Sequence, residues 1–465
     1  MMKDRLFPTE QGTRKIARQL YERIESLPII SPHGHTNPSW FAKDQHFSNP
    51  TDLFVTPDHY VYRMLFSQGV EFSELGFKLD GCLKIEKAPK EIWKIFAKYY
   101  YLFRGTPTRM WLDFVFESLF GIEQTLSENN AEFYYETIDE LLKSSDFKPR
   151  ALFDKFNIEV LSTTDNPLSD LCWHKEIANS DWGGRIIPAY RPDNIIDPGH
   201  NNFLEDILKL GAITGENTER FSGYLAAHFS RRNFFKSMGA TSTDHGHPTA
   251  NTARVSKPEI ESLFDKALQG KLTNEEAEKF RSHMLFEMAK MSIEDGLVMQ
   301  LHPGSFRNHS PFRLKSFGPD RGFDIPSKTD YVQSLKPLLD ELGLDKRLTL
   351  ILFTLDESAL SRELAPLCGV YPCLKLGPPW WFFDSVEGMK RFRRAVTETA
   401  GFYNTVGFND DTRAFCSIRA RHDMARRVDC AYLSDLVVSG QISEKEGHEL
   451  AYQLSYALAK ESYKL

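Results

Sequence analysis

The sequence predicts an α/β protein, a (β/α)8 or TIM barrel with a mostly helical insertion after its first strand. Eight short apolar runs with strand character alternate with helical stretches, which is the sequence form of such a barrel. Polar stretches rich in His, Asp and Arg follow most of these runs, where barrel enzymes hold their active sites. At 465 residues the chain is long enough for one large barrel with an insertion.

The first predicted segment, residues 1–36, contains a helix and the first strand. Within residues 12–26 the apolar residues Ile16, Leu20 and Ile24 recur every four positions, which forms one stripe of an amphipathic helix. Residues 27–30 are all apolar and predict a strand that is buried on both faces.

The second predicted segment, residues 37–155, is the helical insertion. Helices are expected over 91–104 and over 109–120, the latter ended by Gly121 as C-cap. The many aromatic residues of this segment are expected to serve packing.

The third segment, residues 156–465, holds the rest of the barrel and a terminal helix over 441–462. A further helical stretch is expected over 256–294. The remaining seven strands are predicted at 158–163, 185–190, 234–240, 297–301, 348–353, 371–376 and 404–408.

Two histidines, His33 and His35, follow the first strand with one glycine between them. Side chains at alternate positions of an extended backbone share a face, so both imidazoles can bind one divalent ion. Taken alone, such a pair more often represents loop histidines that bind nothing. Polar residues after seven of the eight predicted strands change that interpretation to a mononuclear metal site. These residues include Arg191, Asp193, Asp244, His302, Arg307, Trp381, Asp384, Asp411 and Arg413.

Some of these polar residues have a simpler interpretation. Asp193, Asp356 and Asp384 can each cap the helix that follows them. The non-catalytic alternative for Arg413 is a structural salt bridge.

The bulk composition narrows the class of protein. The formal charge of −7 argues against a nucleic-acid-binding surface, so an anionic substrate needs a few local arginines. The N-terminus lacks the apolar core of a signal peptide, and no apolar run approaches the roughly 20 residues of a membrane span. The six cysteines include no Cys-x-x-Cys pair. A cytoplasmic enzyme that acts on a small molecule is predicted, without nucleic-acid or membrane partners.

The ordered set of motifs resembles the uronate (glucuronate) isomerase family of the amidohydrolase superfamily over essentially the whole chain. The motifs are Pro32–His35, Asp58–Tyr60, Thr163–Pro167, Arg191–Asp193, Ser242–Gly246, Met299–His302 with Arg307, Gly318–Asp324, Trp380–Asp384 and Asp411–Arg413. Members commonly carry Cys-His-x-His and Thr-Asp-Ser-Arg where this chain has Ser-Pro-His-Gly-His and Asp-Asp-Thr-Arg. These departures are typical of a divergent branch.

The resemblance implies interconversion of D-glucuronate with D-fructuronate and of D-galacturonate with D-tagaturonate through a cis-enediol. One metal ion would be held by His33, His35 and Asp411; zinc suits these ligands best, and manganese, iron and cobalt are allowed. Asp411 is the expected base, Tyr60 the acid and base for the substrate oxygens, and Arg413 the residue that holds Asp411 in place. Substrate contacts are expected from His59, Arg191, Asp244, His302, Arg307 and Trp381. A homo-oligomer is expected.

Two other functions stay open at this point. The same barrel and ligands can serve a metal-dependent hydrolase of a lactone, amide or ester. A decayed barrel that binds carbohydrate without turnover is the second alternative.

Overall fold

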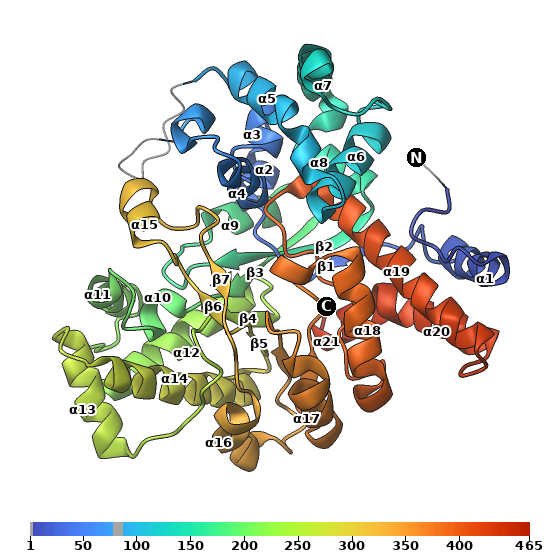
Figure 1. The fold of residues 1–465 in the computed structure, drawn as a ribbon. Coiled ribbons are helices and arrows are strands. Elements are labelled where there is room, and N and C mark those ends of the chain that lie inside the picture. The colour runs from blue at the N-terminus through green and yellow to red at the C-terminus, as the bar shows by residue number, and fades with distance from the viewer. Residues whose placement is uncertain (1–2, 78–86) are drawn as a thin grey trace.

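A parallel β-sheet forms the centre of the protein (Figure 1). In this computed structural model residues 3–77 and 87–465 are described; part of the predicted helical insertion, residues 78–86, lies outside them. The strands follow one another in the sheet in chain order. They are β1 (Ile29–Ser31), β2 (Ile158–Asp165), β3 (Arg185–Tyr190), β4 (Ser242–His245), β5 (Val298–Leu301), β8 (Leu350–Leu352) and β9 (Leu374–Leu376).

The sheet contains seven strands among the described residues, and the predicted α/β class is confirmed. Residues 404–408, the predicted eighth strand, contribute one parallel bridge between Leu376 and Thr405. Further along, the backbone N–H of His35 donates a 3.0 Å hydrogen bond to the carbonyl of Thr412. The segment that follows β1 therefore meets the segment that follows the bridge.

The predicted strand at 234–240 is wrong. Residues 234–237 are the last turn of helix α12 (Phe221–Ser237), and β4 begins only at Ser242. The aromatic run there is the buried face of a helix, since Phe235 is fully buried and its ring lies 5.1 Å from that of Tyr190. Short apolar runs fit a buried helix turn as well as a strand, and periodicity alone does not separate them.

The chain between β1 and β2 is helical throughout its described part, and it covers one side of the sheet (Figure 1, top). A core of fully buried aromatic rings, among them Trp93, Phe96 and Tyr100, holds these helices together. The helix predicted to end at Gly121 has its last helical residue at Ser118, with Leu119 as C-cap, and Gly121 just beyond it has a φ of 70° and donates a 3.1 Å hydrogen bond to the carbonyl of Glu117. The elements are α2 (Pro38–Lys43), α3 (Pro50–Phe54), α4 (His59–Ser67), η1 (Phe72–Leu75), α5 (Pro89–Lys98), η2 (Tyr100–Phe103), α6 (Pro107–Ser118), η3 (Glu128–Asn130), α7 (Ala131–Leu142), η4 (Ser145–Phe147) and α8 (Pro149–Lys155).

Helices also surround the rest of the sheet (Figure 1). The stretch predicted over 256–294 is two helices, because Thr273 starts a new one with a capping box. The helices are α1 (Gln11–Glu22), α9 (Cys172–Ala178), α10 (Asp193–Ile196), α11 (Phe203–Thr214), α12, α13 (Lys257–Leu268), α14 (Asn274–Asp295), α15 (Pro311–Phe317), α16 (Val332–Leu342), α17 (Ala365–Val370), α18 (Val386–Ala400), α19 (Ile418–Val438), α20 (Glu444–Tyr452) and α21 (Leu458–Ser462). Short helical turns are η5 (Leu360–Leu364), η6 (Trp381–Phe383), η7 (Phe415–Ser417) and η8 (Gln453–Ala457).

A short antiparallel hairpin, which pairs β6 (Ser305–Phe306) with β7 (Ile325–Pro326), lies outside the central sheet. No helix in the described ranges is long and apolar enough to cross a membrane. All residues of β1, β4, β5 and β8 are buried, so the ends of these strands place their neighbours in a largely enclosed region.

Candidate active site

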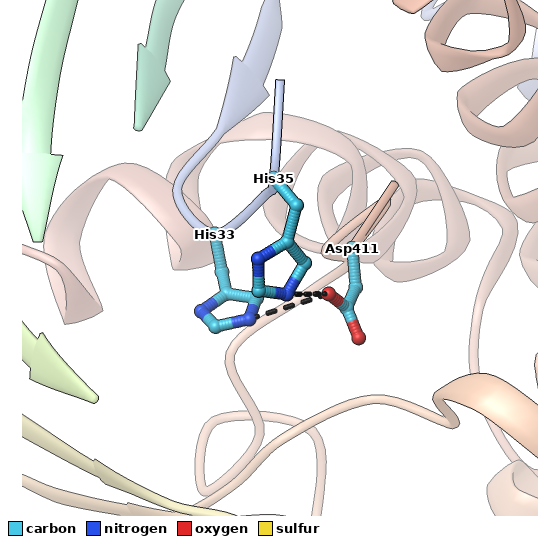
Figure 2. Close-up of side chains that lie close together, drawn as sticks. All are labelled: His33, His35 and Asp411. Carbon is cyan, nitrogen blue, oxygen red and sulfur yellow. Dashed lines mark ion pairs between the residues drawn. The ribbon is translucent and has the colours of Figure 1, made fainter. Parts of the chain in front are cut away.

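His33, His35 and Asp411 converge on one point at the end of β1 (Figure 2). The Oδ1 atom of Asp411 lies 3.3 Å from Nε2 of His33 and 3.2 Å from Nε2 of His35. The two imidazole planes are nearly perpendicular, at 87°. The other carboxylate oxygen of Asp411 points away from both rings (Figure 2). The three predicted metal ligands are therefore brought together, although they come from opposite ends of the chain.

The surroundings of these three residues fit a metal ion. Oδ1 of Asp411 is buried and, within the described part of the chain, has no hydrogen-bond partner, which is a costly state unless a cation satisfies it. Burial alone would lower the pKa of His33, but the carboxylates of Asp244 and Asp411 raise it to about 9. The site thus favours positive charge, and two imidazoles with a carboxylate are a common ligand set for divalent transition metals.

The backbone fixes Asp411 in this position. Its φ angle of 39° lies in the left-handed region, which is uncommon for a residue other than glycine. The hydrogen bond from His35 N to Thr412 O holds the next residue. On the other side, Asp410 is buried and its Oδ2 lies 3.0 Å from Nε2 of His422.

Asp244 lies at the centre of the predicted substrate-binding group and is fully buried. Its Oδ1 is 2.7 Å from Nε2 of His302, and its Oδ2 is 3.3 Å from Nη1 of Arg191. Burial would raise the pKa of Asp244, but His302, His33 and Arg191 hold it well below its usual range. The Asp244 carboxylate therefore lies between the predicted metal ligand His33 and two predicted substrate contacts.

Tyr60 and His59 reach the site from the N-terminus of α4. Asp58 caps this helix by accepting a 2.8 Å hydrogen bond from Tyr60 N. The rings of His59 and Tyr60 stack, with centroids 4.6 Å apart. Burial lowers the pKa of His59 to about 3, and the positive charge of Arg413 adds to this shift. Burial raises the pKa of Tyr60 well above its usual value, although the positive charge of Arg421 opposes the shift. The tyrosine hydroxyl therefore keeps its proton at neutral pH.

The remaining predicted residues lie on the more exposed side. Arg413 forms an ion pair with Asp320, with Nη2 and Oδ2 3.7 Å apart, and its side chain is 44% exposed. Arg307 donates a 3.0 Å hydrogen bond to Asp324 and lies over the ring of Trp381, 5.0 Å from its centroid. Both guanidinium groups keep donors available to an anion.

Sequence reasoning missed a buried ion pair beside the site. Arg421, in the first turn of α19, donates a 2.6 Å hydrogen bond to Asp384 and lies over the ring of Trp111. The alternative interpretation of Asp384 as a helix cap is wrong, because Ser385 is the N-cap of α18. Burial raises the pKa of Asp384 to about 7. The positive charge of Arg421 opposes this shift, and the negative charge of Asp411 adds to it. The pairing of these two residues carries no local sequence signal, because Arg421 is a helical arginine 37 positions away.

The helix-cap interpretation fails for Asp193 as well. Its carboxylate accepts hydrogen bonds from Arg191 Nε at 2.9 Å and from the backbone N–H of Gly246 at 3.1 and 3.2 Å. Pro192, not Asp193, is the N-cap residue of α10. Asp193 also groups with His245 and His247, a cluster that the sequence analysis did not identify.

The parallel sheet, the paired histidines after its first strand and the aspartate near its last segment define an amidohydrolase-like protein with a candidate metal centre. The chain matches the family model described as "Glucuronate isomerase" over residues 7–463. It is 58% identical over 463 residues to the uronate isomerase of Rhizobium meliloti (strain 1021), covering 99% of this chain and 98% of that protein. It is 55% identical over 462 residues to the uronate isomerase of Brucella melitensis biotype 1, covering 99% of both.

Two solved structures are similar as a whole. The glucuronate isomerase of Caulobacter crescentus superposes with a TM-score of 0.98 at 53% identity, covering 100% of this chain and 97% of that chain. The uronate isomerase of Thermotoga maritima gives 0.93 at 28% identity, covering 100% and 99%. The chain belongs to the glucuronate isomerase family, whose members are aldose–ketose isomerases.

Proposed function

We propose that this enzyme interconverts D-glucuronate with D-fructuronate and D-galacturonate with D-tagaturonate. The observation that carries the proposal is the convergence of His33, His35 and Asp411, with Asp411 Oδ1 buried and lacking a hydrogen-bond partner within the described chain. Family membership supplies the reaction class, and the relatives named above are uronate and glucuronate isomerases.

A divalent ion held by these three residues would polarise the substrate carbonyl as a Lewis acid. Zinc suits two imidazoles and one carboxylate best, while manganese, iron and cobalt are compatible. Asp244 lies on the other side of the His33 ring, with its Oδ1 3.8 Å from Nδ1, a charge interaction and not a hydrogen bond.

The isomerisation moves one proton from C2 to C1 and one proton from the C2 hydroxyl to the C1 oxygen. We assign the carbon protons to the outward-pointing carboxylate oxygen of Asp411, which takes one proton from C2, exchanges it with solvent and delivers one to C1 on the same face of the enediol. Tyr60 is the proposed proton donor and acceptor for the two oxygens, since burial keeps its hydroxyl protonated and the charges of Arg421 and Asp411 act on it. The bond changes balance with no other reactant.

The substrate carboxylate requires guanidinium groups, whose planar fork matches it with two hydrogen bonds. Arg191 and Arg307 are the proposed partners, while His59, Asp244, His302 and Trp381 contact the sugar hydroxyls. Arg413 forms an ion pair with Asp320. We propose that Arg413 both positions Asp411 and anchors the part of the site near Asp320.

The proposal also includes the architecture of the whole chain. We infer that the seven strands and the bridge at Thr405 form the wall of a (β/α)8 barrel, because His35 N bonds to Thr412 O across the ends of the sheet. Division of the chain at residues 36 and 155, assembly into a homo-oligomer and a cytoplasmic location remain predictions.

The test is turnover of D-glucuronate and D-galacturonate, followed by proton NMR in D2O before and after treatment with a chelator. Formation of the 2-keto uronate with deuterium at C1, lost on chelation and restored by a divalent ion, supports the proposal. The ratio of the two rates identifies the preferred sugar. Absence of any ketose, with acid released from a panel of lactones and amides, would instead support the hydrolase alternative.

A further inference from the structure

A second group of possible metal ligands lies where β3 and β4 end. Asp193 follows β3, His245 is the last residue of β4, and His247 comes two residues later. One ligand atom from each residue lies within 4.8 Å of the other two. The sequence His245-Gly246-His247 repeats the His-Gly-His pattern of residues 33–35 on a different strand.

The two histidines are buried and incompletely satisfied. His245 is 0% exposed and His247 is 4% exposed. Considering every residue that the structure describes, Nδ1 of His245 and both ring nitrogens of His247 have no hydrogen-bond partner. Buried polar atoms without partners cost free energy, and in native proteins each requires an explanation such as a bound ion.

The remaining polar contacts prepare these side chains for a ligand. Nε2 of His245 lies 3.1 Å from the hydroxyl of Thr243, which fixes the ring and leaves Nδ1 as its free ligand atom. Gly246 N holds the Asp193 carboxylate, and Arg191 bonds only to its Oδ2. Oδ1 therefore retains a lone pair for a cation.

The local charge also favours a cation. The charged groups that face His247 are the carboxylates of Asp193, Asp197 and Glu278 and the guanidinium of Arg281. Arg281 is already bonded to Asp197 and to Glu278, at 2.8 Å each.

We propose that Asp193, His245 and His247 form a second divalent-metal site, distinct from the His33–His35–Asp411 centre, that takes a transition-metal ion such as Zn²⁺. Such an ion would join the loop after β3 to the loop after β4. Arg191 lies in the loop after β3, and Asp244 in β4 directly precedes His245, so the ion would hold both residues in register without contacting the substrate. This inference does not depend on the proposed reaction.

The test is the metal stoichiometry of the full-length protein after metal removal and equilibrium dialysis against Zn²⁺, measured by elemental analysis. The wild type is expected to bind two ions per chain, His247→Gln one, and the double variant His33→Ala/His35→Ala one. Adding His247→Gln to that double variant should remove the last ion. His228→Gln is the matched control, because it changes another fully buried histidine, on α12, and should retain two ions.

Two outcomes overturn the inference. The first is a wild type that binds one ion, lost in His33→Ala/His35→Ala and retained in His247→Gln; this result leaves the proposed active-site metal intact. The second outcome is a His33→Ala/His35→Ala variant that binds no cobalt, and it decides the matter if His247→Gln does not fold. The His33→Ala/His35→Ala variant is then loaded with Co²⁺, and X-ray absorption should detect two imidazole nitrogens on the cobalt. A cobalt-free variant contradicts the second site.

Discussion

The guanidinium of Arg421 and the carboxylate of Asp384 form an ion pair at 2.6 Å in which each side chain is only 3% exposed. Arg421 also lies 3.5 Å from the ring centroid of Trp111, in the helical part of the chain between β1 and β2. This pair therefore connects α19, the segment after β9 and helix α6 directly beside the candidate active site.

Removing Asp384 should destabilise the fold. Asp384→Ala leaves the Arg421 guanidinium buried without its partner, and breaking a buried pair in this way costs about 3–5 kcal/mol. The matched control is Asp340→Ala, which breaks an exposed pair with Lys336 and should cost about 0–1 kcal/mol. Denaturant unfolding of both variants measures the difference, and equal midpoints would contradict the structural role of the Asp384–Arg421 pair.

Asp411→Asn should lower kcat by at least roughly 10²–10⁴-fold, the usual contribution of a positioned base. The amide cannot accept the C2 proton, and it is a poorer ligand than a carboxylate. Asp356→Asn changes an aspartate beyond β8, where the side chain accepts hydrogen bonds from Ser358, and should keep normal kcat. Steady-state rates with either uronate decide the matter. Near-normal turnover by Asp411→Asn would remove the residue from its assigned role.

Tyr60→Phe should lower kcat by roughly 10²–10⁴-fold with little change in KM, because it removes only the hydroxyl. The ring contacts with His59 and Trp111 stay in place. Tyr62→Phe is the control from the same helix; its hydroxyl donates to the Asp320 carbonyl, and its loss should cost about 0.5–1.5 kcal/mol of stability without affecting kcat. Equal kcat values for the two variants would assign the proton transfers to another group.

Gly246→Ala should weaken substrate binding, because the added methyl would lie 2.8 Å from Arg191 Nη2, 2.8 Å from the His302 ring and 3.0 Å from Asp193 Oδ2. These groups are tied to one another by hydrogen bonds, so moving one displaces the rest. We expect a raised KM and a lowered kcat/KM. Gly183→Ala, which meets nothing within 4 Å, should behave as wild type. A Gly246→Ala enzyme with unchanged kinetics would show that Arg191 and His302 are not needed in their present positions.

The sequence predicts best what depends on neighbouring residues or on the ends of strands. His33 and His35 are two positions apart on one extended stretch, His302 directly follows β5, and Asp411 follows the segment that bridges to β9. Local pattern failed at 234–240, where packing against Tyr190 turns an aromatic run into the end of a helix.

The parts that could not be predicted depend on docking between distant segments. Tyr60 lies at the start of a helix whose position is set by an aromatic core, and only family resemblance pointed to it. Arg421 looks like any helical arginine until α19 is packed against Asp384. The Asp193–His245–His247 cluster requires the register of β3 beside β4, which pairs Tyr190 with Thr243.

The helical elements between β1 and β2 provide Tyr60, whereas the three proposed metal ligands come from the edges of the sheet. Metal retention and catalysis are therefore separable as the protein is heated. If the α2–α8 layer loosens first, the remaining sheet keeps its ion and loses its proton donor. Heat inactivation would then precede metal release, and cooling would restore turnover without added metal.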